Sequence, residues 1–284
     1  MDGEYFAMRD DRKPREFFDK SINLIIKFAS RRNCVELYNK ACDRESHPVQ
    51  KIGPLRNGYT QEPLEVVPRM YSRGDDLTEI KNGAILPITD RYLFLCQEMK
   101  RHGAEEIFSL GDQSEATAGI RPDGPESTYH SVYTWLCWFI CFGSDPAKIA
   151  EIAPFLCKAG KDRLIDTVLK SFQPDRVVAK TCMNPETFGL LDKVIDAPPS
   201  ERPQLIETYL EDWPKFMGHL GGLSSIGIEN TYRVRDYASL VAAIGDDYQG
   251  FWAWEAALVV KFFNIDDNSF KDNEFYPYDL VHFS

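Results

Sequence analysis

The chain lacks several features that mark secreted, membrane and nucleic-acid-binding proteins. Its first residues contain no basic stretch followed by an apolar one, so we expect no secretory signal. The most apolar run, residues 132–143, has about a dozen residues, whereas a membrane span needs about 20. Asp and Glu (44) outnumber Lys and Arg (33), and the net charge of −11 opposes binding to a phosphate backbone. These features predict a cytoplasmic protein that contacts neither membrane nor nucleic acid directly.

Patterns of metal-binding and disulfide-forming residues are also lacking. Seven cysteines are an odd number without a regular spacing, which favours a reducing compartment and core packing. Cys137 and Cys141 lie one helical turn apart, but tetrahedral zinc needs four ligands and no second pair is nearby in sequence. Five histidines are scattered. We therefore expect no metal and no cofactor.

No catalytic motif is present either. The glycine-rich residues 221–227 lack the Gly-Lys-Ser/Thr ending of a phosphate-binding loop. Asp266-Asp267-Asn268 begins like a calcium loop, but Lys271 occupies the position where that loop requires glycine. A Gly-x-Ser-x-Gly nucleophile elbow is absent. The sequence thus predicts no catalytic residue and a protein that is not an enzyme.

Apolar residues recur at helical spacing along most of the chain. The hydrophobic pattern predicts about ten helices and an all-α fold in two closely packed helical subdomains. Asp145 and Pro146 have the residue types of an N-cap and first helical position. Among the expected helices are residues 14–32, 89–102, 129–142, 147–157, 162–172, 185–195, 203–213, 236–244 and 250–263.

Two segments have the composition of connections. Prolines and glycines interrupt residues 47–82 so often that we expect a long ordered loop there. Residues 110–126 are polar and acidic and contain Gly and Pro, as in an exposed connection. We place an N-terminal helical domain at 1–143, which includes the loop, and a C-terminal helical domain at 144–284.

The negative charge is concentrated in two stretches. Residues 105–126 carry six acids and one base, and residues 245–284 carry eight acids and two bases. Such patches either keep a solvated surface soluble or steer a basic partner. For Asp266 and Asp267, a role in capping or bracing the fold is a further possibility. The candidate partner-binding residues are Asp112, Glu115, Asp123, Glu126, Asp246, Asp247, Asp266 and Asp267.

The C-terminal region contains the most specific pattern. Glu255 falls within an apolar helix, where a carboxylate is costly unless it is hydrogen-bonded, so we expect a basic or hydroxyl partner elsewhere in the core. Tyr276-Pro277-Tyr278 is expected to tie down the chain terminus. The residues of this structural signature are Trp252, Glu255, Lys261, Tyr276, Pro277 and Asp279.

These residues resemble a known family. Gly-Phe-Trp-x-x-Glu-Ala-Ala at 250–257, the Lys and Asp-Asp that follow, and the closing Tyr-Pro-x-Asp-Leu are similar to the C-terminal signature of PoNi-type immunity proteins. Arg9-Asp10 before Phe17-Phe18, and residues 209–213, resemble other parts of that family. The resemblance implies an all-helical antitoxin that binds a cognate nuclease toxin of type VI secretion and blocks it. It supplies no catalytic residue.

Two other classes stay open. One is an all-α hydrolase whose site is assembled from residues distant in sequence, which a pocket with convergent His and carboxylate groups would reveal. The other is a scaffold protein without a toxin partner, whose gene would not lie beside a toxin gene. Homodimer formation is also open, because the apolar helices can be buried within one chain.

Overall fold

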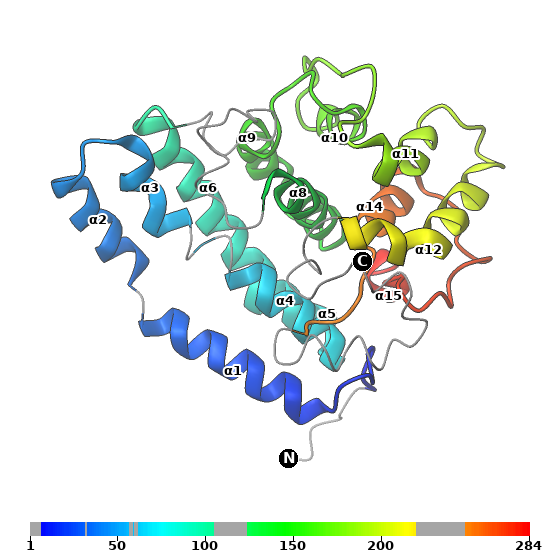
Figure 1. Ribbon diagram of the computed structural model, residues 1–284, viewed down its shortest axis with the longest axis horizontal. Helices are drawn as coiled ribbons and strands as arrows, with labels where there is room; N and C mark the ends of the chain where they lie inside the picture. The colour runs from blue at the N-terminus through cyan, green and yellow to red at the C-terminus, as the bar shows by residue number, and fades with distance from the viewer. Residues whose placement is uncertain (1–6, 32, 57–58, 60–61, 105–123, 220–247) are drawn as a thin grey trace. The chain divides into compact units, whose positions relative to one another are not determined.

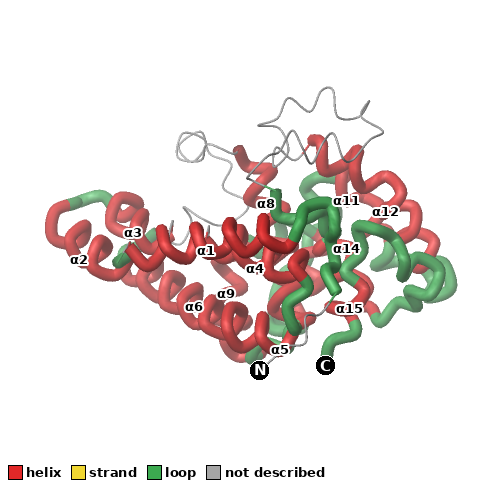
Figure 2. The backbone as a smooth tube through the Cα atoms, turned by 90° about the horizontal axis from the view of Figure 1, so that it is seen from below, coloured by secondary structure: helices red, strands yellow, loops and turns green. Residues whose placement is uncertain are grey.

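The computed structural model describes residues 7–31, 33–56, 59, 62–104, 124–219 and 248–284. Helices and loops make up this described part, and no strand occurs within it (Figure 2). The expected all-α class is confirmed. None of the described helices is both long and apolar enough to cross a bilayer.

The chain divides into two compact units. Unit 1 comprises residues 1–105 and 236–251, and unit 2 comprises 106–235 and 252–284. These units follow a different division from the expected domains 1–143 and 144–284, because the helix that ends at Cys141 belongs to unit 2. The boundary expected at residue 143 stays a prediction.

Unit 1 contains the first helices of the chain, which Figure 1 shows in blue and cyan. Helix α1 packs on α4, α2 packs on α3, and α3 packs on α6. Buried Phe18 and Ile22, four residues apart, place one face of α1 in the core. The helices are α1 (Arg15–Arg31), α2 (Cys34–Arg44), α3 (Pro48–Arg56), α4 (Glu62–Arg73), α5 (Leu77–Ile80), the π-helix η2 (Lys81–Ile85) and α6 (Leu86–Arg101).

The expected loop at residues 47–82 is wrong, since α3, α4, α5 and the beginning of η2 occupy this stretch. Pro48 and Pro63 lie in first turns, where the missing amide hydrogen has no helical acceptor. Pro54 and Pro68 lie inside helices, where each removes one backbone hydrogen bond. Burial of neighbouring apolar side chains compensates for that loss. Those buried side chains include Ile52, Leu55, Val66, Val67 and Tyr71.

Unit 2 is built around two apolar helices. Helix α8 (Gly124–Cys141) packs on α14 (Trp254–Phe263), and Trp138 meets Trp254 edge-to-face at 5.9 Å between ring centroids (Figure 1). The end of α8 agrees with the expected buried helix 129–142. Around this pair lie α9 (Pro146–Leu156), α10 (Arg163–Lys170), α11 (Pro185–Lys193), α12 (Arg202–His219) and α15 (Tyr278–Val281).

Local sequence signals set several helix ends. Asp145 caps α9 through a 2.9 Å hydrogen bond from the Ala147 amide, with Pro146 at the first position, as expected. The expected helix 250–263 begins only at residue 254. Gly250 has a positive φ of 98°, and the Ala253 amide donates to the Phe275 carbonyl at 2.8 Å, so this backbone is held in a non-helical conformation.

Some expected features lie outside the described residues. They are the glycine-rich residues 221–227, the short helix at 236–244 and most of the connection expected at 110–126, whose last residues, 124–126, instead begin α8.

Candidate functional site

Glu255 is a buried carboxylate of unit 2 that contacts three side chains on two other helices. It lies in the first turn of α14, and its side chain is fully buried. The Tyr209 hydroxyl and the Trp213 indole nitrogen, both on α12, donate to Oε1 at 2.8 and 2.6 Å. Nε2 of His130 on α8 lies 3.2 Å from Oε2. The expected core partner of Glu255 is therefore found, and the carboxylate joins three helices.

This arrangement is a structural network. A buried carboxylate is tolerated when hydrogen bonds occupy its oxygens, and Glu255 has contacts on both. Trp213 also stacks on Phe275 at 4.9 Å between ring centroids. The network thus fixes α12, α14 and the segment before α15 together.

A second group of polar contacts ties down the chain terminus. Lys261 Nζ donates to the carbonyls of Val281 and Phe283 at 2.7 and 3.1 Å. The buried Asp267 carboxylate accepts from the Tyr276 hydroxyl at 2.9 Å and lies 2.9 Å from Nε2 of His282. Burial and the Asp267 charge raise the pKa of Tyr276. These contacts agree with the clasp expected at residues 276–278.

The remaining residues of the signature also lie in this region. Trp252 is buried just before α14, with its ring 6.3 Å from that of Trp254. Pro277 precedes the first turn of α15, and Asp279 lies within that turn. All of these positions belong to unit 2.

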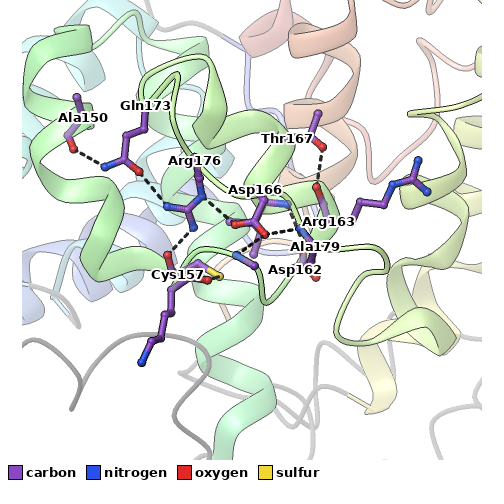
Figure 3. Close-up of polar contacts among 12 residues, drawn as sticks. Ala150, Cys157, Asp162, Arg163, Asp166, Thr167, Gln173, Arg176 and Ala179 are labelled. Carbon is purple, nitrogen blue, oxygen red and sulfur yellow. Dashed lines mark hydrogen bonds and ion pairs between the residues drawn. The ribbon is translucent and has the colours of Figure 1, made fainter.

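A third network was missed by the sequence reasoning. Asp166 on α10 is fully buried, and its Oδ1 accepts from Arg176 Nε at 2.8 Å. Its Oδ2 accepts from the amides of Gly160 and Ala179, each at 3.0 Å. Figure 3 shows Arg176 reaching from Asp166 to the Cys157 carbonyl. One carboxylate and one guanidinium thus hold the loops on both sides of α10.

Asp162 completes this third network. Its Oδ1 caps α10 by accepting from the Ile165 amide at 2.8 Å, and its Oδ2 accepts from the Met183 amide at 2.7 Å. The side chain is fully buried. The loop after α10 is therefore hydrogen-bonded to the beginning of that helix twice, through the amides of Ala179 and Met183.

The sequence does carry a signal for these residues. Asp162 and Asp166 lie four positions apart, and Asp166 falls among the apolar residues Leu164, Ile165, Val168 and Leu169. A carboxylate on an apolar helix face predicts a buried polar partner, the same reasoning that singled out Glu255.

The expected acidic contacts are only partly described. Asp112, Glu115, Asp123, Asp246 and Asp247 lie outside the described residues; Glu126 lies in α8, but its side chain does not belong to the described part. Asp266 is exposed and accepts from the Asn268 amide at 3.2 Å. Asp267 is buried in the clasp. The acidic partner surface stays a prediction.

Unit 1 has a polar cluster of its own between α2 and α6. The Tyr38 hydroxyl donates to Glu98 and lies 2.9 Å from Nε2 of His102, while Cys42 Sγ lies 3.7 Å from the same nitrogen. Burial, followed by the Glu98 contact, raises the pKa of Tyr38. Both Glu98 and Cys42 approach the same imidazole nitrogen, so Glu98 is not placed to orient His102 as a base for Cys42.

Across the part of the chain that the structure describes, no group of three or more His, Cys, Asp or Glu residues is arranged to hold a metal ion.

Comparison with known proteins finds a family similarity in the C-terminal part. Residues 160–280 match the family model of the PoNe immunity proteins (PoNi), C-terminal. This stretch, less than half of the chain, is thus similar to the PoNi C-terminal region. The matched residues include Glu255, Lys261, Asp267 and Asp166, so the central carboxylate or amine of each buried network of unit 2 lies within the match.

The fold has a counterpart among solved structures. Protein PA2201 from Pseudomonas aeruginosa superposes with a TM-score of 0.69 over 98% of this chain and 90% of that chain, at 15% sequence identity. At this identity the similarity concerns the fold alone. The comparison with curated proteins gives no match.

Proposed function

We propose that this protein is an immunity protein that binds and neutralises a cognate bacterial nuclease (DNase) toxin delivered by type VI secretion. The match of residues 160–280 to the PoNi region carries the proposal. In this proposal the protein acts in the cytoplasm, where a nuclease meets nucleic acid, and protects the producing cell and its kin.

The mode of action is binding rather than catalysis. The polar groups of the PoNi signature support this mode, because Glu255, Lys261 and Asp267 make their hydrogen bonds within unit 2. These bonds fix helices and the chain terminus against each other. A rigid scaffold lowers the entropy lost when a partner docks.

The charge of the chain supports a nuclease as the partner. A nuclease must attract DNA and tends to present a basic surface, which an acidic inhibitor with a net charge of −11 attracts over a distance. We propose that the acidic stretches at residues 105–126 and 245–284 make this contact. Exposed Asp266 belongs to the second stretch.

Co-expression tests the proposal. The toxin encoded beside this gene is expressed with and without this protein in a sensitive host, growth is scored, and the complex is purified through a tag on the toxin. We expect restored growth and a stable complex, whereas a catalytically inactive toxin should allow growth without this protein. Killing that persists despite soluble protein, with no complex, would contradict the immunity role for that pair.

A further inference from the structure

The segment before α1 is bound to the end of α4. The amides of Arg9 and Asp10 both donate to the Ser72 carbonyl at 3.1 Å. The Arg9 guanidinium donates to the Tyr71 carbonyl at 3.1 Å and lies over the Tyr71 ring at 4.5 Å from its centroid. We call residues 7–12 the strap. The strap is not helical, yet main-chain and side-chain hydrogen bonds fix it to a helix end.

The strap holds residues from the other end of the chain. Asp10 is buried, and its carboxylate accepts from the hydroxyl of buried Tyr248, which lies 238 positions further along the sequence. Burial, followed by the Asp10 charge, raises the pKa of Tyr248, so the hydroxyl keeps its proton at neutral pH. Ser72, which accepts from the strap, donates through Oγ to the Gln249 carbonyl at 2.8 Å. Tyr248 and Gln249 are therefore both anchored in unit 1.

The chain passes from unit 1 to unit 2 directly after these anchors. Phe251 is the last residue of unit 1, and Trp252 belongs to unit 2. Connections between domains are usually exposed and flexible, whereas Phe251 and Trp252 are only 6% and 7% exposed. The Ala253 amide donates to the Phe275 carbonyl within unit 2. From Gln249 to Ala253 the chain spans at most about 14 Å, so it has little slack between the two anchors.

This connection leads into a helix that lacks a capping side chain. Helix α14 begins at Trp254, and its N-cap residue is Ala253, whose methyl group cannot accept a hydrogen bond from the first turn. The first turn carries Glu255, which joins three helices through its hydrogen bonds. The position of this turn therefore depends on the backbone that precedes it.

We propose that the strap is a latch on the chain where it passes from unit 1 to unit 2. By holding Tyr248 and Gln249, the strap restrains residues 250–253 and so stabilises the first turn of α14. A short segment that is anchored at both ends transmits the loosening of one anchor to the other. Asp10 thus stabilises a helix of unit 2 from within unit 1. The latch needs no partner molecule, so it can be tested independently of the proposed function.

Hydrogen exchange of the full-length protein, followed by NMR, tests the latch at the amides of Ala253 and Ala257. These amides donate to the carbonyls of Phe275 and Ala253 at the beginning of α14. Asp10→Ala removes the acceptor of the Tyr248 hydroxyl and should speed exchange at both amides about tenfold, as expected for the loss of one hydrogen bond. Tyr248→Phe removes the same contact but keeps the ring in the core, so it gives the same test if Asp10→Ala does not fold.

Asp76→Ala is the matched control. Asp76 also accepts from backbone amides of unit 1, those of Thr78 and Glu79 at 2.8 and 3.1 Å, where it caps α5. Its removal should speed exchange at Thr78 and Glu79 and leave the two amides of unit 2 unchanged. Unaltered exchange at these two amides in Tyr248→Phe, shown by circular dichroism to be folded, would overturn the latch. Equal acceleration there by Asp76→Ala would indicate a general loss of stability and would also overturn it.

Discussion

At the scale of single residues, buried carboxylates join the helices and loops of unit 2 by hydrogen bonds. Glu255, Asp166 and Asp162 are fully buried, and all three accept hydrogen bonds from residues on other elements. Sequence reasoning could predict that Glu255 needs a partner, because a carboxylate in an apolar run is costly. It could not name Tyr209 and Trp213, which lie more than forty positions away and approach only in the folded chain.

Replacing Glu255 tests this network. Glu255→Leu removes the acceptor of the Tyr209 and Trp213 hydrogen bonds and should lower the free energy of unfolding by about 3–5 kcal/mol, since polar groups in the core lose a partner. Urea unfolding at pH 7 measures the change. Glu211→Leu on α12 is the matched control, because Glu211 is exposed, and should change stability little. A similar loss in both variants would contradict the role of the network.

Because the Cys157 thiol is buried, we expect the protein to lose stability in alkali. Burial is the main cause that raises the pKa of Cys157 to about 12, above an ordinary value near 9. Because the pKa is higher in the folded state, the stabilising contribution is complete below pH 9 and is lost as the pH rises from about 9 to about 12. Cys157→Ala should therefore show a shallower fall in unfolding free energy between pH 8 and pH 10. Parallel curves for the two proteins would contradict this assignment.

At the scale of elements, helix ends were more predictable than helix interiors. The Asp145-Pro146 pair and the glycine after α6 act locally, and their positions could be predicted. The helices within residues 47–82 could not be predicted, because the effect of each proline depends on its place in a helix and on which side chains that helix buries. Pro68 is itself buried within α4. Tertiary packing therefore outweighed local propensity there.

Two helix-ending glycines form a matched pair for a steric test. Gly74 and Gly103 both have positive φ, at 86° and 66°. A Cβ at Gly103 would meet nothing within 4 Å, whereas one at Gly74 would overlap the Ala7 carbonyl. Gly103→Ala should cost about 1–2 kcal/mol from the left-handed backbone alone. Gly74→Ala should cost more in the same thermal or urea unfolding experiment, and equal losses would contradict the close approach of Ala7.

The loops around α10 allow a test of local rigidity. Arg176→Met leaves Asp166 buried without its guanidinium partner, so the amides of Gly160 and Ala179 should exchange hydrogen faster. Hydrogen exchange followed by mass spectrometry or NMR measures the change. Arg202→Met, which removes a hydrogen bond to the Ala197 carbonyl and a cation–π contact with Phe263 but no contact with Asp166, serves as the control. Unaltered exchange at both amides would show that the ion pair does not hold the loops.

At the scale of the whole molecule, the all-helical class and the similarity of the C-terminal part to the PoNi family were predictable, since both follow from periodic or contiguous sequence patterns. The division into units was not, because residues 248–251 return to unit 1 after the long excursion of the chain through unit 2. Ser72 Oγ donates to the Gln249 carbonyl at 2.8 Å, and Tyr248 donates to Asp10. No local pattern predicts these contacts, which join residues 177 and 238 positions apart.

Net charge predicts how association depends on salt. If the acidic stretches steer the toxin, the association rate should fall as salt rises from 50 to 300 mM, because charges farther apart than about 10 Å are screened at ~0.1 M. Lysine in place of Asp112, Glu115, Asp123 and Glu126 should lower both the rate and its salt dependence in stopped-flow measurements. Unchanged kinetics would remove the acidic surface from the mechanism and leave the immunity role intact.

Inhibition of purified toxin tests the immunity role most directly. DNA cleavage by the toxin of the neighbouring gene is followed while this protein is added in increasing amounts, with the Glu255→Leu variant as a destabilised comparison. We expect cleavage to fall to zero near an equimolar ratio. Full cleavage in the presence of an excess of folded wild-type protein would contradict the role proposed for this chain.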